Sequence, residues 1–162
     1  MPTERRSRTI PAPVEDLWAV VGDPHHLPRW WPRVTRVEDV EDGAFTEVMT
    51  TAKGKVVRAD FQLVELDGGR WTLRWEQRIE GTPFARVLKS AVTEVRLAPV
   101  VAADGGTASG AQPARGGPAT EVTIELRQSL NGFFPRLGGH MVRRAAAATI
   151  DEALDGLERI SA

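Results

Sequence analysis

The end of the chain constrains the fold most, because residues Phe133 to Ala162 have the pattern of one long amphipathic helix. Pro135 fits the first helical turn, where its missing N–H costs no hydrogen bond, and no proline follows before Ile160. Apolar side chains recur at steps of three and four residues and form one stripe: Val142, Ala146, Ile150, Ala153, Leu157 and Ile160. A helix with one apolar stripe must cover another layer of the protein.

The middle of this helix is poor in bulky apolar side chains. Gly139, Ala146, Thr149 and Ala153 are small, whereas the larger apolar residues gather towards the C-terminal end. Small residues on a buried helix face have two explanations: they let the helix approach a sheet closely, or they leave room for something else. The helix pattern by itself favours close packing.

The rest of the chain has mostly the alternating pattern of β-strands. One strand is predicted at Glu4–Ile10, and two short helices follow it, over about residues 12–21 and 23–31. Six further strands are predicted at residues 34–40, 45–51, 56–66, 71–80, 84–97 and 120–130. Short turns join most of these strands, which indicates an antiparallel sheet.

The predicted fold class is therefore α+β. A curved sheet of seven antiparallel strands with one apolar face needs a cover, and only the closing helix is long enough to be one. We expect the sheet to wrap around this helix and the two short helices to brace one edge. A space would then lie between the sheet and the closing helix.

We interpret residues 1–162 as one domain, because a chain of this length can bury a sizeable core. One segment, at about residues 98–119, is rich in Gly, Ala, Pro and Ser. Such a composition cannot bury enough apolar surface to offset the entropy of ordering. We predict a flexible hairpin loop there, inserted between the last two strands.

The composition excludes several classes of function. A net charge of −1 argues against binding nucleic acid, and against a polybasic membrane anchor. No apolar run resembles a signal peptide or could span a bilayer, so we expect no stable membrane insertion and a cytoplasmic location. The chain has no cysteine and no tyrosine, which excludes thiolate and tyrosyl chemistry. Its 18 Arg against 3 Lys are typical of a GC-rich genome, and we expect a bacterial protein.

No motif in the sequence indicates a metal, a cofactor or a catalytic triad, and we expect no cofactor. His25 and His26 are adjacent on a short helix, where side chains point about 100° apart, so they would chelate a metal poorly. His140 falls on the polar face of the closing helix. No inward carboxylate or histidine is apparent in the pattern, which weakens any acid–base mechanism.

Polar residues on apolar faces are the informative positions, because burying an amide without a partner is costly. Gln77 and Gln128 fit this description, and Thr149 lies at the edge of the helix stripe. We predict that they contact a ligand, together with Trp75, Trp71, Ala146, Val142 and Trp30. Alternatives stay open: Trp71 and Trp75 would also fill a core, and Trp30 would also anchor its short helix to the sheet.

The opening of the chain resembles a known superfamily. The runs IPAPVEDLW, from Ile10 to Trp18, and DPHHLPRWWPRV, from Asp23 to Val34, are similar to the opening of START-like (SRPBCC) proteins. These are the helix-grip proteins: polyketide cyclases and dehydrases, lipid-transfer START domains and the Bet v 1-like group. The resemblance implies a mostly hydrophobic internal cavity, and with it the small residues of the closing helix are expected to face that cavity.

Three hypotheses of function follow. The first is binding of a small hydrophobic molecule of lipid, polyketide or aromatic type, and the second, which the resemblance allows, is an enzyme like a polyketide cyclase or dehydratase. The third is a protein-interaction module that uses Trp30, Trp31 and the edge from Leu137 to Met141, and a homodimer is an open alternative. An ionisable side chain that projects into a real cavity would favour the enzyme.

Overall fold

The computed structural model describes residues 2–100, 117–132 and 136–162. The chain begins with β1 (Thr3–Ile10), α1 (Val14–Val21), the 3-10 turn η1 (Pro24–His26) and α2 (Leu27–Trp30). Five elements follow: β2 (Val34–Glu41), β3 (Ala44–Thr50), β4 (Val56–Asp67), β5 (Thr72–Arg78) and the 3-10 turn η2 (Pro83–Arg86). The chain ends with β6 (Leu88–Val100), β7 (Ala119–Leu130) and α3 (Arg136–Ile160).

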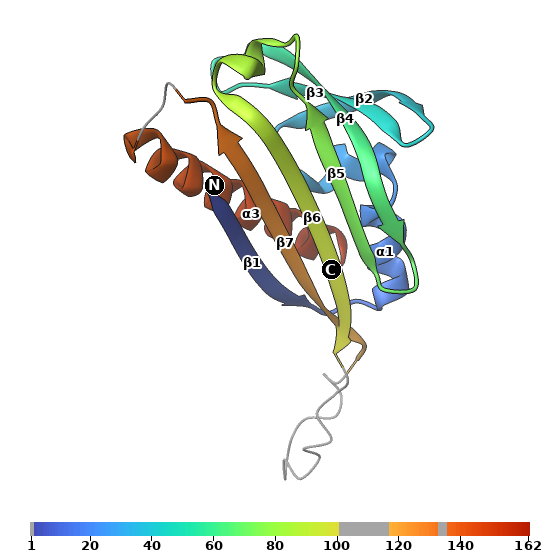
Figure 1. Cartoon of the computed structure of the whole chain (residues 1–162). Helices are drawn as coiled ribbons and strands as arrows, with labels where there is room; N and C mark the ends of the chain where they lie inside the picture. The colour runs from blue at the N-terminus through green and yellow to red at the C-terminus, as the bar shows by residue number, and fades with distance from the viewer. Residues whose placement is uncertain (1, 101–116, 133–135) are drawn as a thin grey trace.

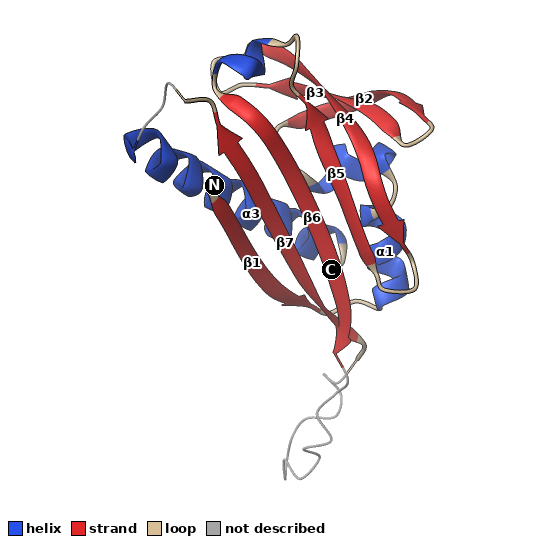
Figure 2. Cartoon of the chain, viewed as in Figure 1, coloured by secondary structure: helices blue, strands red, loops and turns tan. Residues whose placement is uncertain are grey.

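The described strands form one seven-stranded sheet in the order β1-β7-β6-β5-β4-β3-β2. Every neighbouring pair is antiparallel. The long helix α3 crosses behind the sheet, and the shorter helices lie on the same side (Figure 1 and Figure 2). The prediction of an antiparallel sheet covered by the closing helix is therefore confirmed. No described helix combines the length and the hydrophobicity that a membrane crossing requires.

Three boundaries differ from the prediction for local reasons. β5 begins at Thr72, because Trp71 has a φ of 52° and leaves the extended conformation. β6 begins at Leu88, because Pro83 starts a 3-10 turn where a strand was expected. β6 and β7 pair as far as Val100 and Ala119, so both strands run into the predicted insertion. Residues 101–116 of that insertion, and 133–135 before α3, lie outside the described residues.

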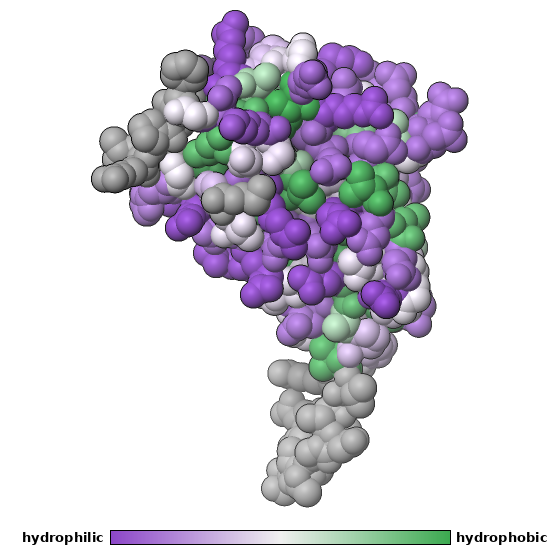
Figure 3. Space-filling model, in the orientation of Figure 1, coloured by the Kyte–Doolittle hydropathy of each residue, from purple (hydrophilic) through white to green (hydrophobic). Residues whose placement is uncertain are grey.

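The outer face of the sheet, opposite the helices, is mostly hydrophilic (Figure 3). Its charged side chains form ion pairs, across strands in Arg74 with Glu65 at 3.1 Å and along β6 in Arg96 with Glu94 at 2.7 Å. Exposed pairs of this kind contribute little to stability, but they keep this face solvated. The apolar side chains of the strands lie on the opposite face of the sheet, which α3 covers.

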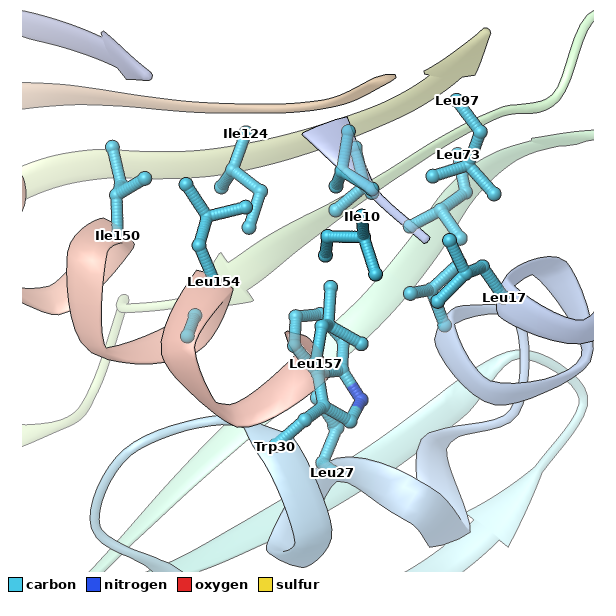
Figure 4. Packing of buried hydrophobic residues seen from close by; sticks show 14 of the residues in the cluster. Ile10, Leu17, Leu27, Trp30, Leu73, Leu97, Ile124, Ile150, Leu154 and Leu157 are labelled. Carbon is cyan, nitrogen blue, oxygen red and sulfur yellow. The ribbon is translucent and has the colours of Figure 1, made fainter. Parts of the chain in front are cut away.

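The C-terminal half of α3 packs directly into the core. Ile150, Leu154 and Leu157 are at most 1 % exposed. They lie among Ile10, Ile124 and Trp30 from the sheet and α2 (Figure 4). Burying one such aliphatic side chain contributes roughly 1.5–3 kcal/mol. This half of the helix therefore fastens the two layers together.

Gly156 lets the backbones of α3 and α2 approach each other. A Cβ atom at this position would lie 2.4 Å from the carbonyl oxygen of Trp30, closer than any packed contact allows. The Trp30 side chain is 2 % exposed, and its Nε1 has no hydrogen-bond partner among the described residues. The missing side chain of Gly156 therefore allows the backbone of α2 to pack directly against α3.

A candidate ligand cavity between the sheet and the long helix

A cavity of about 820 Å³ lies between the sheet and the N-terminal half of α3. Its helix side consists of Val142, Ala145, Ala146 and Thr149. Its sheet side is mostly apolar and aromatic: Met49, Val57, Phe61, Trp75, Leu88, Ala91, Val92 and Leu126, with Trp31 after α2 and Phe84 in η2. The polar side chains among the sheet residues that line it are Glu47, Arg58, Gln77, Thr93 and Gln128.

The exposed lining residues show where the cavity meets solvent. Lys55, Val56 and Arg58 come from the turn between β3 and β4 and from the start of β4, and Val87 follows η2. Val56 is 61 % exposed although it is apolar. We therefore place the mouth between this turn, η2 and the first half of α3.

Six of the predicted site residues line this one cavity: Gln77, Gln128, Trp75, Thr149, Ala146 and Val142. The register explains why both glutamines face it. Gln128 pairs with Ala91 on β6, and Gln77 pairs with Phe61 on β4, so both stand on the apolar face of the sheet. Their contact with a ligand remains a prediction.

Trp71 and Trp30 lie outside the lining, unlike the other predicted site residues. The positive φ of Trp71 breaks the alternation of its strand, and its ring packs edge-on against Trp18 with centroids 5.7 Å apart. Trp30 is buried beside α3, so it is also missing from the exposed surface that the interaction hypothesis requires. Its neighbour Trp31 lines the cavity instead and packs edge-on against Trp75 at 5.7 Å.

The small residues of α3 divide into two groups. Ala146 and Thr149 line the cavity, whereas Ala153 is fully buried in the core beside it. A Cβ atom on Gly139 would meet no atom within 4 Å, and Gly139 is not part of the lining. The expectation that all four residues face the cavity is therefore wrong for Ala153 and Gly139. The cavity borders α3 only from Val142 to Thr149, about two turns of the helix.

Glu47 is the functional candidate that the sequence reasoning missed. It lies on β3 between Val37 and Ala59, lines the cavity and is 2 % exposed. The expectation that no carboxylate points inward is wrong. The alternation of Phe45, Glu47 and Met49 places Glu47 on the apolar face, and the rule that selected Gln77 and Gln128 would have selected it as well.

The surroundings of Glu47 keep its carboxyl group neutral. Burial raises the pKa of Glu47 from its ordinary value of 4.5 to about 8. No described residue forms an ion pair with it, and its Oε1 has no hydrogen-bond partner. Phe45 precedes it by two residues and stacks on Phe61 with ring centroids 5.4 Å apart. Glu47 is therefore a protonated acid in a largely apolar part of the cavity wall.

The histidines take no part in the cavity. The Nδ1 of His25 lies 2.9 Å from Asp23 Oδ1, and His140 is exposed on α3. Among the described residues, no three His, Asp or Glu side chains gather in a way that could hold a metal ion. The polar chemistry of this site is therefore that of one acid, two amides and two threonine hydroxyls in an apolar cavity, with the basic side chains of Lys55 and Arg58 at its mouth.

This chain belongs to the family described as polyketide cyclase / dehydrase and lipid transport, whose model matches residues 1–161. The resemblance to START-like proteins is confirmed. No curated protein sequence matches the chain.

Solved structures share the fold at low sequence identity. A START superfamily protein from Mycobacterium smegmatis is 11 % identical with a TM-score of 0.72, over 98 % of this chain and 96 % of that one. The protein XoxI from Bacillus cereus is 13 % identical with a TM-score of 0.70, over 99 % of this chain and 96 % of that one. The di-domain ARO/CYC BexL from the BE-7585A biosynthetic pathway is 20 % identical with a TM-score of 0.74, over 98 % of this chain but 46 % of that one.

Proposed function

We propose that this protein binds a small hydrophobic molecule in the cavity between the sheet and α3. The observation that carries the proposal is the cavity itself, with its volume of about 820 Å³ and its aromatic and aliphatic lining. Small-molecule sites typically measure about 300–1,000 Å³ and combine apolar walls with a few well-placed polar groups. A lipid, a polyketide or a polycyclic aromatic compound has the matching size and polarity.

The polar groups in the wall would orient such a molecule. Gln77 and Gln128 stand on the strands on either side of β6, and Thr149 faces them from the helix. The family description names polyketide chemistry and lipid transport, and both involve hydrophobic molecules that carry a few oxygens. Binding would be driven by the apolar walls, and the orientation would be set by the amides.

Native mass spectrometry of freshly purified protein tests the proposal. We expect a small molecule to remain bound in gentle ionisation and to leave on collisional activation. The matched control is Ala146→Phe, whose ring occupies the cavity from the helix side and should abolish the added mass. Equal retention by wild type and variant would place the molecule elsewhere and contradict the proposal.

A second candidate, an enzyme like a polyketide cyclase or dehydratase, is favoured by one observation. Glu47 is an ionisable side chain that projects into the cavity, and its pKa of about 8 is near that of an effective general acid or base at neutral pH. Removal of a proton from a carbon beside a carbonyl group is a step that such a residue could perform, with the chain of the substrate held folded by the walls.

This candidate is tested by proton exchange on a model ketone. In deuterated water, 2-tetralone exchanges the protons beside its carbonyl group, and proton NMR follows the loss of their signal. We expect wild type to accelerate this exchange and Glu47→Gln to remove the acceleration, because an amide cannot take up the proton. Equal rates with both proteins would exclude the catalytic role of Glu47.

A further inference from the structure

We propose that Glu47 and Gln77 together form a carbonyl-binding site in the cavity, so that the ligand carries hydrogen-bond-accepting oxygens facing β3 and β5. This inference rests on the proposed function, and it names the chemistry of the ligand. It would make the two residues determinants of specificity rather than parts of a uniform apolar wall.

Unpaired polar atoms are the first argument. Three buried side-chain atoms lack a hydrogen-bond partner in the described part of the chain: Trp30 Nε1, Glu47 Oε1 and Gln77 Nε2. Glu47 and Gln77 line the same cavity, whereas Trp30 does not. A buried polar group without a partner is costly, and for both residues the cavity beside them is the place where a partner would lie. A ligand oxygen fits this requirement for each.

The positions of the two side chains are the second argument. Glu47 stands opposite Ala59 on β4. Gln77 stands opposite Phe61, two residues further along β4. Two strand spacings, about 10 Å, separate β3 from β5. The two groups therefore contact different parts of one ligand, whose apolar body would rest on Phe61 and Trp75.

Charge is the third argument, because it selects an acceptor over a cation. The other ionisable side chains of the lining are Lys55 and Arg58, which are both basic, exposed and at the mouth, and Arg58 pairs with Glu38. The flanking β2 and β4 present Val37 and Ala59 to Glu47, and the helix side of the cavity carries no charge. Basic residues at the mouth repel an ammonium ligand. A protonated Glu47 and the amide of Gln77 both donate, which matches carbonyl oxygens.

A pair of fluorescent probes separates carbonyl recognition from simple apolar binding. Prodan carries a ketone on a dimethylaminonaphthalene ring, and 2-(dimethylamino)naphthalene is the same ring system without the ketone. Fluorescence titration gives the Kd of each probe for wild type, Glu47→Leu, Gln77→Leu and Glu47→Gln. Glu76→Gln, on the outer face of the same sheet, is the matched control.

We expect Glu47→Leu and Gln77→Leu each to weaken prodan binding roughly two- to tenfold, the range for one hydrogen bond. The ketone-free probe should bind all variants equally. Glu47→Gln should retain prodan binding, because its amide also donates. Prodan binding to wild type should weaken as the pH rises through about 8, where Glu47 loses its proton, and this dependence should be absent in Glu47→Gln.

Three results would overturn the inference and leave the proposed function intact. Equal changes for the two probes would show that the variants alter the walls and not carbonyl recognition. Unchanged prodan affinity in both leucine variants would show that the two side chains make no contact with the ketone. Tighter prodan binding at high pH would show that the carboxylate form is the binding form. If neither probe binds wild type, the proposed function fails together with the inference.

Discussion

Glu47 combines a cost to folding with a chemical capability. A carboxylate in an apolar wall destabilises the folded state, because water no longer solvates the charge. The protein therefore holds the group as a neutral acid, which donates a hydrogen bond in a place where water competes little. An apolar side chain of similar size would fill the same site without that cost. The stability of the fold therefore gives no reason for an acid at this position.

Replacing Glu47 by glutamine should remove a pH dependence of stability. The pKa is raised from 4.5 to about 8 by burial, so between these values the folded state binds one more proton than the unfolded state. The stability of wild type therefore falls as the pH rises through this range, by on the order of 5 kcal/mol. Near pH 4 the two proteins should be similar, and near pH 9 Glu47→Gln should be the more stable.

Urea unfolding across this pH range measures the effect. The control Glu76→Gln changes an exposed carboxylate, and its profile should follow that of wild type. If the profiles of Glu47→Gln and wild type run parallel, the carboxyl group is solvated in solution and its assignment to an apolar wall is wrong.

The helix α3 has two halves with different environments. In the C-terminal half, Ala153 is fully buried against the core, and a larger side chain there would have no space. In the N-terminal half, Ala146 borders the cavity, and a larger side chain would extend into open volume. The same residue type on the same face of one helix thus has two roles, which only the packing distinguishes.

Phenylalanine at these two alanines should separate the two roles. Ala146→Phe should leave the free energy of unfolding within about 1 kcal/mol of wild type, because the ring enters a cavity with apolar walls. Ala153→Phe should destabilise by roughly 1–3 kcal/mol or more, because it overpacks a dense core. Urea unfolding of both variants measures these changes in the free energy of unfolding. Comparable destabilisation by both would mean that the cavity is closed in solution.

Gly156 should be intolerant of substitution although it lies inside a helix. Alanine is the better helix former by up to about 1 kcal/mol, which by itself would stabilise α3. At position 156 its Cβ would lie 2.4 Å from the Trp30 carbonyl oxygen, so α2 must move. We expect Gly156→Ala to destabilise by roughly 1–3 kcal/mol.

The matched control lies in the same helix. A Cβ atom on Gly139 would meet nothing within 4 Å, so Gly139→Ala should stabilise by a few tenths of a kcal/mol up to about 1 kcal/mol. Thermal unfolding of both variants compares them directly. A stabilising effect of Gly156→Ala would show that α2 and α3 are further apart than described.

At the scale of the whole molecule, the order and packing of the layers were predictable from sequence, whereas part of the cavity wall was not. Alternation placed Gln77 and Gln128 on the inner face because β5 and β7 are regular there. Trp71 was misassigned because one positive φ, which no periodicity shows, turns it out of its strand. The cavity depends on the distance between sheet and helix, and that distance is set by packing at the far end of α3, including Gly156.

A cavity between two layers links ligand binding to the stability of the whole fold. A ligand that binds only the folded state stabilises it by RT ln(1 + [L]/Kd), which is about 1.4 kcal/mol at ten times Kd. For a chain of this size, prodan at that concentration should raise the Tm of wild type by roughly 3–6 °C. Ala146→Phe, at the same probe concentration, should show almost no rise, because its ring occupies the volume that the probe needs. A rise of equal size in the variant would place the bound probe outside the cavity, because the phenylalanine ring in the cavity would then have no effect on probe binding.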